Sequence, residues 1–378
     1  MDRLRQPRPE LGDISPYDAK DVRAEVNLSA NENPHNLPGE LLEKLADRVR
    51  FDVPFNRCPD PMATRLRELI AEANGLDAAN VLVGNGGDEI ILDIILAWGG
   101  PGRKLLDMPP TFAMYGIDAR MTGTRVVEVS RTPEFEVDGP ALMQAVAEQD
   151  PDIIVVSNPN NPTGTMTPET LLIDLLEATD ALVLVDEAYF EFSRQTMRPH
   201  MSRHPNLAIL RTFSKAFSLA GLRAGYLLAD PEVVRELTKV RQPYSVNRFT
   251  QVAAELAFRD RVVFEAGVRE AMRNRDSLVH GLSQMAEVAV FPSEANYILF
   301  RIDQAAAVWR DLLHDHSILV RDFSRTPGLE DCLRVTVGSE EEVARFLKAM
   351  DEIIACKHAS AHFGINATAS RHLERNGE

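Results

Sequence analysis

Three short apolar runs constrain the fold of this sequence more than any other feature. The runs are DIIVVS (152–157), ALVLVD (181–186) and LAILRTFS (207–214); each is rich in β-branched residues and ends in polar side chains. Continuous apolar runs of this length are typical of parallel strands that are buried on both faces of a sheet. Ligands of open α/β sheets bind just beyond the carboxyl ends of the strands. The sequence therefore predicts an α/β fold whose polar strand ends converge on one site.

Lys215 and Asp186 stand at two of these strand ends. A lysine amine forms a Schiff base with an aldehyde, and the ring of pyridoxal phosphate carries such an aldehyde and acts as an electron sink. The ring nitrogen must stay protonated, which a neighbouring aspartate favours. Taken singly, the lysine is typical of a surface residue, the aspartate of a strand-end cap, and SNPNNPTG (157–164) of a tight turn. Their order and context together favour a pyridoxal phosphate enzyme.

A fourth strand end supplies groups that suit a phosphate. The run VLVGNGGDEIILDIILAW (81–98) predicts a strand, a glycine-rich turn and an apolar helix. Glycines let backbone N–H groups approach an anion, and a helix N-terminus favours negative charge. Glycine turns before helices are ordinary, so this signal is weak alone. Thr212, Ser214 and Arg223 add hydroxyl and guanidinium donors for the same dianion.

With these motifs the chain resembles the fold type I pyridoxal phosphate enzymes and, within them, the histidinol-phosphate aminotransferase family. The resemblance extends from LGDISPYD near Tyr17, through VNLSANENP (26–34), to LRVTVG (333–338). It implies a large domain with a mostly parallel seven-stranded sheet flanked by helices, and a smaller α+β domain. It also implies pyridoxal 5′-phosphate as the cofactor and a homodimer with active sites near the interface.

The resemblance further implies a role for each matching residue. Lys215 would form the Schiff base and shuttle the proton, Asp186 would contact the pyridine nitrogen, and Tyr189 would share the ring hydroxyl with Asn161. Phe112 would stack on the ring. The cofactor phosphate would be bound by Gly86, Gly87, Thr212, Ser214 and Arg223, and Asp88 would also belong to the cofactor site.

The substrate residues implied by the resemblance are Tyr17, Asn33, Arg321 and Arg334. A guanidinium can fork onto a carboxylate or a phosphate, so Arg334 is the best candidate for gripping the substrate. A structural salt bridge would be an equally good interpretation of Arg334 without the family match. Histidinol phosphate has no α-carboxylate, whereas glutamate has two carboxylates, so Arg334 would have to hold phosphate in one half-reaction and carboxylate in the other.

Two positions depart from the family pattern. The family usually has tyrosine at the position of Cys58, where it reaches the cofactor phosphate of the neighbouring subunit. A thiol is a shorter and weaker donor than a phenol, so we expect weaker cofactor retention or a bridging water there. The family more often has asparagine at Ser245, in a loop expected to border the substrate site.

Composition and charge narrow the class of protein. The chain has 378 residues and a formal net charge of −16, which argues against nucleic acid or an anionic membrane as a partner. It has no apolar window long enough to span a bilayer, and residues 1–11 lack the apolar core of a signal peptide. We therefore expect a cytoplasmic protein. Its three cysteines suggest no disulfide framework, and we expect no metal site.

The sequence also predicts the domain organisation. Residues 1–35 would form an N-terminal arm on the small domain, 36–255 the large cofactor domain, 256–356 the small domain, and 357–378 a disordered tail. A long helical stretch, broken at Gln242-Pro243, is expected from Pro231 to Met285. The runs VAVFPS, ANYILFRI and CLRVTVG predict strands of the small domain, and a closing amphipathic helix would be capped by Ser339.

The resemblance implies an aminotransferase that converts L-histidinol phosphate and 2-oxoglutarate to imidazole-acetol phosphate and L-glutamate by a ping-pong mechanism. An aromatic aminotransferase or a threonine-phosphate decarboxylase of the same fold remains an alternative. A non-enzymatic, pyridoxal-sensing regulator is disfavoured, because the matched region begins near the N-terminus and the sequence contains no basic helix-turn-helix.

Overall fold

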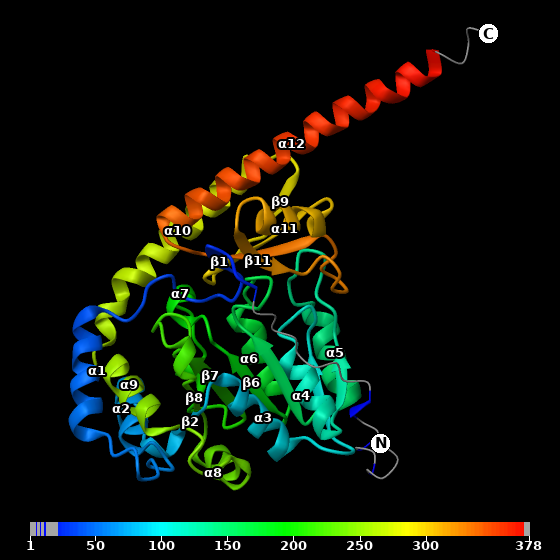
Figure 1. The fold of residues 1–378 in the computed structure, drawn as a ribbon. Coiled ribbons are helices and arrows are strands. Elements are labelled where there is room, and N and C mark those ends of the chain that lie inside the picture. The colour runs from blue at the N-terminus through cyan, green and yellow to red at the C-terminus, as the bar shows by residue number, and fades with distance from the viewer. Residues whose placement is uncertain (1–4, 6–7, 9–10, 13–21, 374–378) are drawn as a thin grey trace.

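The protein is built on two sheets that lie one above the other in Figure 1. The computed structural model describes residues 5, 8, 11–12 and 22–373. In the seven-stranded sheet the strand order is β2 (Val81–Gly84), β8 (Gly225–Leu228), β7 (Leu207–Thr212), β6 (Leu182–Asp186), β5 (Ile153–Ser157), β3 (Lys104–Asp107) and β4 (Arg125–Glu128). Within it β8 runs antiparallel to both of its neighbours, and the other pairs are parallel. The predicted α/β fold with a mostly parallel seven-stranded sheet is confirmed.

Helices cover both faces of this sheet because its strands are apolar on both sides. On one face Leu82, Leu184 and Leu210 pack against α3 (Gly87–Trp98), α4 (Met114–Thr122) and α8 (Pro231–Val240). On the other face Val83, Val185 and Ile209 pack against helices that include α1 (Gly39–Asp52), α2 (Thr64–Asn74), α5 (Gly139–Gln149), α6 (Glu169–Ala178) and α9 (Arg248–Arg259). Alternate residues of each strand thus enter two separate apolar cores, as a period of two requires.

The smaller sheet has the strand order β1 (Val26–Leu28), β11 (Ile318–Asp322), β12 (Cys332–Thr336), β10 (Tyr297–Ile302) and β9 (Val288–Val290). Its apolar core is completed by α10 (Glu265–Ser283), α11 (Ala305–His314) and α12 (Glu340–Leu373). The strand β1 pairs in parallel with β11, so the N-terminal segment joins this sheet. The sequence analysis predicted β9, β10 and β12 but neither β1 nor β11 as strands.

Helix α12 begins at the predicted cap. Ser339 Oγ accepts a hydrogen bond from Glu342 N at 3.3 Å, and the Glu342 carboxylate accepts from Ser339 N at 2.8 Å, which is a capping box. The helix then continues to Leu373 and projects beyond the body of the protein in Figure 1. This differs from the prediction of a disordered tail from 357 onward. The segment contains few helix breakers, so a helix that is nucleated on the sheet can propagate through it.

The helical stretch after the large sheet is interrupted more often than predicted. The expected break at Gln242-Pro243 separates α8 from α9, and a second one follows at Asp260, where a short 3₁₀ turn over Arg261–Phe264 precedes α10. The loop between α8 and α9 contains Tyr244 in the left-handed region, at φ +65°. Three helices therefore connect the two sheets.

Arg211 of β7 forms a buried ion pair with Glu187, the residue that follows β6. Arg211 donates from Nε and Nη2 to Glu187 Oε2 at 3.0 and 2.9 Å, and the two residues are 5% and 1% exposed. The guanidinium carbon lies 3.7 Å from the centre of the Phe190 ring. The next residue, Thr212, points to the opposite face of the sheet, because side chains alternate along a strand.

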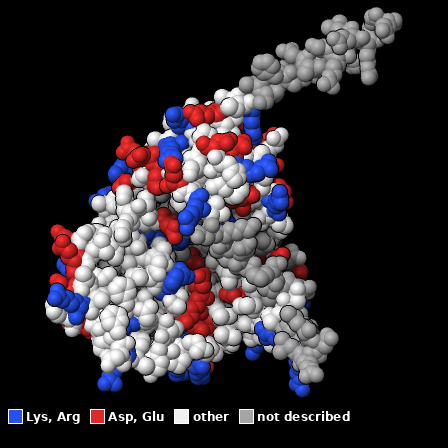
Figure 2. Space-filling view, in the orientation of Figure 1, with Lys and Arg blue, Asp and Glu red and all other residues white. Residues whose placement is uncertain are grey.

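The surface shown in Figure 2 carries acidic and basic side chains scattered among uncharged ones. Within the described part of the chain, the structure contains no helix that is both long and apolar enough to cross a membrane.

Candidate active site

The predicted strand ends meet in one cavity of about 160 Å³. Ser157 lies directly opposite Asp186 across β5 and β6, and Asp186 lies opposite Leu210 of β7. Since these strands are parallel, their carboxyl ends open on the same side. The cavity is lined by Gly87, Asp88, Ile91, Phe112, Tyr115, Ser157, Asn161, Asp186, Ala188, Tyr189, Leu210, Thr212, Ser214, Lys215 and Arg223. Every residue predicted to contact the cofactor is in this set except Gly86, which adjoins it.

Lys215 follows β7 and extends its amine into the cavity. Lys215 Nζ donates a hydrogen bond to the backbone carbonyl of Ala30 at 3.0 Å. Burial lowers the pKa of Lys215 to about 8, and the positive charge of Arg334 acts in the same direction. A larger fraction of this amine is therefore uncharged near neutral pH than in an exposed lysine, and the uncharged amine is the form that a nucleophile requires.

Asp186 is the last residue of β6 and is 7% exposed. Its Oδ2 accepts a hydrogen bond from the Tyr115 hydroxyl at 2.6 Å, and its Oδ1 accepts from Ala188 N at 3.0 Å. Burial raises the pKa of Asp186 to about 6, while these two hydrogen bonds oppose the rise. The carboxyl group is thus mainly ionised at neutral pH.

The glycine turn after β2 is shaped to approach an anion. Gly86 has φ +86°, and a Cβ atom added there would lie 2.6 Å from Arg223 Nη2. The same Nη2 donates to Asp88 Oδ2 at 2.6 Å. Glu89 Oε2 accepts from Asn85 N at 2.6 Å and from Ser245 Oγ at 2.9 Å, so Ser245 adjoins this turn. The turn, the start of α3 and Arg223 together gather donors at one end of the cavity.

The groups predicted to face the cofactor ring lie on the other walls. Phe112 packs edge to face with Tyr115, with ring centroids 5.5 Å apart. Asn161 Oδ1 accepts from Arg334 Nη1 at 2.5 Å. The hydroxyl oxygen of Tyr189 accepts from Asn31 Nδ2 at 2.9 Å.

Two of the predicted substrate residues lie on adjacent strands of the small sheet. Arg334 of β12 stands directly opposite Arg321 of β11, and Arg334 Nη2 donates to the Ser29 carbonyl at 2.7 Å. Both guanidinium groups lie near the Phe323 ring, at 5.8 Å for Arg321 and 5.5 Å for Arg334. This arrangement suits the binding of an anionic substrate group.

Two further residues singled out in the sequence, Asn33 and Cys58, are not among those that line this cavity. Asn33 donates to the Ala216 carbonyl at 3.3 Å, one residue after Lys215. Tyr17 lies outside the described residues. Cys58 is exposed, and its carbonyl accepts from Arg248 Nη2 at 2.7 Å.

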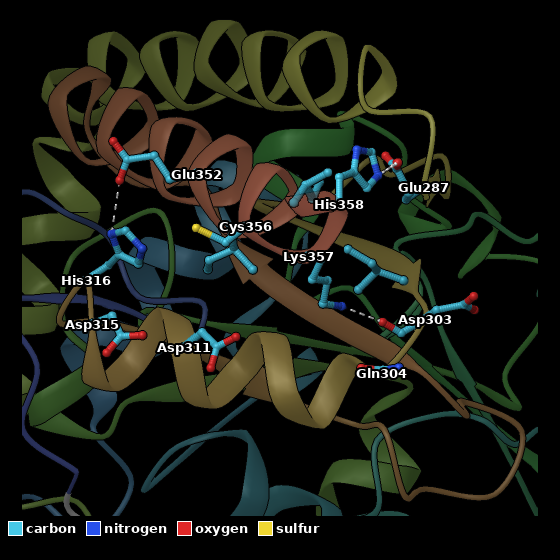
Figure 3. A pocket seen from close by; sticks show the side chains of 13 residues that line it. Glu287, Asp303, Gln304, Asp311, Asp315, His316, Glu352, Cys356, Lys357 and His358 are labelled. Carbon is cyan, nitrogen blue, oxygen red and sulfur yellow. Dashed lines mark hydrogen bonds and ion pairs between the residues drawn. The ribbon is translucent and has the colours of Figure 1, made fainter. Parts of the chain in front are cut away.

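A larger cavity of about 810 Å³ lies between α11 and α12 (Figure 3). Its walls carry Asp311, Asp315, His316 and Glu352, with His316 Nδ1 3.7 Å from a Glu352 carboxylate oxygen. It contains none of the predicted site residues, so the chemistry of the lining side chains, and not size, identifies the candidate active site.

Comparison with known proteins identifies the family of this chain. Residues 23–350 match the family model for aminotransferase class I and II. The chain belongs to the class I and II aminotransferases. It is 40% identical to "Histidinol-phosphate aminotransferase 1" of Carboxydothermus hydrogenoformans, over 94% of this chain and 100% of that one. It is also 40% identical to the histidinol-phosphate aminotransferase of Thermobifida fusca, over 91% of this chain and 94% of the relative.

Solved structures share the fold of this aminotransferase. The histidinol-phosphate aminotransferase of Sinorhizobium meliloti, in complex with pyridoxal-5′-phosphate, has a TM-score of 0.81 at 24% identity, over 88% of this chain and 91% of that chain. The L-threonine-O-3-phosphate decarboxylase of Porphyromonas gingivalis has a TM-score of 0.77 at 26% identity, over 87% and 99% of the two chains. The fold therefore accommodates more than one reaction.

Tyr115 and Asn31 are polar residues that contact this aminotransferase site and that the sequence did not single out. Tyr115, which donates to Asp186, is fully buried at the start of α4, three residues after Phe112. Its position so close to Phe112 was an available signal. Asn31, which contacts Tyr189, follows β1, and no signal linked the two, because 158 positions separate them.

Proposed function

We propose that the protein is a pyridoxal phosphate-dependent histidinol-phosphate aminotransferase, which exchanges an amino group between L-histidinol phosphate and 2-oxoglutarate. The observation that carries this proposal is the meeting of Lys215 and Asp186 at one cavity, where the Arg334 guanidinium donates to the lining residue Asn161 at 2.5 Å. The curated relatives support the substrate, since they match nearly the whole chain and bear this enzyme's name.

The cavity fits the cofactor by the chemistry of its donors. Gly86, Gly87, Thr212, Ser214 and Arg223 would hold the phosphate, with Asp88 orienting Arg223 through their 2.6 Å contact. At the opposite end, Asp186 would contact the ring nitrogen, Phe112 the ring face, and Tyr189 and Asn161 the ring hydroxyl. When bound, pyridoxal phosphate supplies an aldehyde and an electron sink for charge that develops at the substrate carbon.

The chain's own residues then supply binding, orientation and proton transfer. Lys215 Nζ would be the nucleophile toward the cofactor aldehyde, and as a free amine it would take a proton from the substrate carbon and return it, as a general base and acid. Its lowered pKa, about 8, suits both roles near neutral pH. Asp186 would stay ionised and favour a protonated ring nitrogen. The Ala30 carbonyl, 3.0 Å from Lys215 Nζ, gives the protonated amine an acceptor.

Arg321 and Arg334 would recognise the anionic end of each substrate. The two residues are paired across β11 and β12, both guanidinium groups lie near the Phe323 ring, and each can fork onto a phosphate or a carboxylate. This arrangement serves a phosphate in one half-reaction and a carboxylate in the other. Asn33 would lie near the reacting amine, beside Ala216, and Tyr17 would assist at the phosphate end.

A single-turnover absorbance experiment tests this function. The purified protein loaded with pyridoxal phosphate is mixed in turn with L-histidinol phosphate, L-glutamate, L-phenylalanine and L-threonine phosphate. We expect both histidinol phosphate and glutamate to convert the cofactor to its amine form. Release of carbon dioxide from threonine phosphate, with no reaction of histidinol phosphate, would instead indicate the decarboxylase. A protein that fails to take up the cofactor would contradict the proposal as a whole.

We also propose that the protein acts as a homodimer through the surface around the end of α1. Phe51, in the last turn of α1, and Phe55, three residues beyond its end, are 71% and 76% exposed. Leaving such large apolar side chains in water is unfavourable by about 1.5–3 kcal/mol each. The neighbouring Cys58 would then approach the partner's cavity, as the resemblance implies.

Replacing both Phe51 and Phe55 by serine is expected to convert the dimer to monomer at micromolar concentration and to lower activity at least tenfold, because about 3 kcal/mol or more of association energy is lost. Sedimentation velocity measures the oligomeric state. The matched control is Leu96→Ser on α3, where the side chain is 47% exposed. A double variant that sediments as the wild type does would contradict this interface.

A further inference from the structure

Asn31 is buried where the chain passes from β1 of the small sheet to the cavity. It is 1% exposed and has φ +55°, in the left-handed region that asparagine tolerates. Its backbone N–H donates to Thr336 Oγ1 at 2.9 Å, and its carbonyl accepts from Asn296 Nδ2 at 3.1 Å. The small sheet therefore fixes the position of this residue from both sides.

Thr336 also determines which way the Asn31 amide faces. The Thr336 hydroxyl oxygen accepts the Asn31 N–H, so its hydrogen is available for the Asn31 side-chain oxygen, 3.4 Å away. With that oxygen turned to Thr336, the Asn31 Nδ2 group faces Tyr189 and donates to its hydroxyl oxygen at 2.9 Å. An inverted amide would place two donors against Thr336, and the Tyr189 hydroxyl would then have to donate its hydrogen to Asn31 Oδ1.

The direction of this hydrogen bond decides what the Tyr189 hydroxyl can do. A phenol has one hydrogen to donate and two lone pairs that accept. The Asn31 amide occupies a lone pair, so the hydroxyl hydrogen stays available for the cavity that Tyr189 lines. The Tyr189 ring itself is held edge to face against Tyr297, with centroids 5.1 Å apart.

We propose that Asn31 is a positioning residue that directs the hydroxyl hydrogen of Tyr189 into the cofactor cavity. The inference rests on the proposed function, in which Tyr189 faces the ring hydroxyl of pyridoxal phosphate. A donated hydrogen bond stabilises the ionised form of that ring oxygen and lowers its proton affinity. Asn31 thereby tunes the cofactor without touching it.

Asn31→Asp is the sharpest test, because it keeps size and backbone tolerance but replaces the amide donor with an acceptor. The new carboxylate would take the Tyr189 hydrogen for itself. Asn31→Gly removes the side chain and keeps the left-handed backbone accessible. The matched control is Asn80→Asp, since Asn80 is half-buried, donates to the Ala229 carbonyl at 2.9 Å and does not line the cavity.

The measurement is a pH titration of the absorbance of bound pyridoxal phosphate in the holoenzyme without substrate. Asn31→Asp is expected to move the midpoint to higher pH by about one unit, because a hydrogen bond to an ionised oxygen is lost. Tyr189→Phe should cause a shift of the same sign and similar size, and Asn80→Asp none. The double variant Asn31→Asp, Tyr189→Phe should shift no further than Tyr189→Phe alone.

The outcomes separate the inference from the proposed function. If Tyr189→Phe shifts the midpoint and Asn31→Asp and Asn31→Gly do not, Asn31 has no positioning role, although the proposed function stands. Additive shifts in the double variant would equally overturn the inference. If the wild-type protein binds no pyridoxal phosphate, the proposed function itself fails. Near-ultraviolet circular dichroism of each variant checks that its tertiary structure is retained.

Discussion

Lys215→Ala is expected to abolish turnover while the protein still binds pyridoxal phosphate without a covalent link. Lys215 lines the cavity, where burial and Arg334 lower its pKa to about 8. At pH 8 about half of the amine would be uncharged, ready to attack an aldehyde and later to accept a proton. The substitution removes both steps, and loss of the proton transfer alone costs about 10²–10⁴-fold. Steady-state transamination assays measure the result.

Borohydride reduction gives this prediction a readout that is independent of rate. In the wild type it should fix the cofactor mass to the peptide that contains Lys215, and in the variant it should leave the chain unmodified. Lys239→Ala serves as the control, because Lys239 is a lysine of α8 that pairs with Glu236 at the surface. Measurable turnover by Lys215→Ala without an added amine would show that another group carries the chemistry.

Asp186→Ala is expected to lower kcat by about 10³-fold or more. Its carboxylate would hold the proton on the ring nitrogen, and without it the ring loses most of its power to withdraw electrons. Asp186→Asn separates charge from shape, since the amide fills the same space but carries no negative charge; it should lose nearly as much activity. Rapid-quench and steady-state assays test both variants. A near-wild-type rate in either would show that a different acid protonates the ring.

The Asp186 carboxylate, which is expected to raise kcat, is also expected to lower the stability of the folded protein. The pKa of Asp186 is raised from 3.8 to about 6 in the folded protein, so the folded state binds more protons than the unfolded state between these values. Stability is therefore lost as pH rises from about 4 to 6, by roughly 2–3 kcal/mol. In the cofactor-free protein, Asp186→Asn should be more stable than the wild type above pH 6 and similar to it below pH 4. Urea unfolding at both pH values measures this difference.

The large sheet could be predicted because its strands are buried on both faces. Continuous apolar runs such as 153–157 and 182–186 leave few alternatives, and the polar residues that end them line the cavity as expected. The small sheet was harder to predict from the sequence. The strand β1 has only three residues, Val26–Leu28, and β11 ends in the charged pair Arg321 and Asp322, so neither carries a strong periodic signal.

The site contacts that sequence could not predict are those made between distant segments. In the run SANENP, the resemblance points to Asn33 as a residue near the reacting amine, and it gives no sign that Asn31 contacts Tyr189. Asn31 has φ +55°, in the left-handed region. Its backbone is held there by hydrogen bonds with Thr336 and Asn296, which lie far away in the sequence. The contact of Tyr115 with Asp186 could not be predicted for a related reason, because the two residues are 71 positions apart.

The buried ion pair of Arg211 and Glu187 helps to fix the register of β7, the strand that leads to Lys215. If β7 slipped by one residue, the side chains would exchange faces, and the Arg211 guanidinium would enter the cavity in place of the Thr212 hydroxyl. The slip would also leave the Glu187 carboxylate, 1% exposed, without its counter-ion, at a cost of about 3–5 kcal/mol. An ion pair that adds little net stability thus disfavours a shifted register of β7. Lys215 is thereby kept at the correct position at the edge of the sheet.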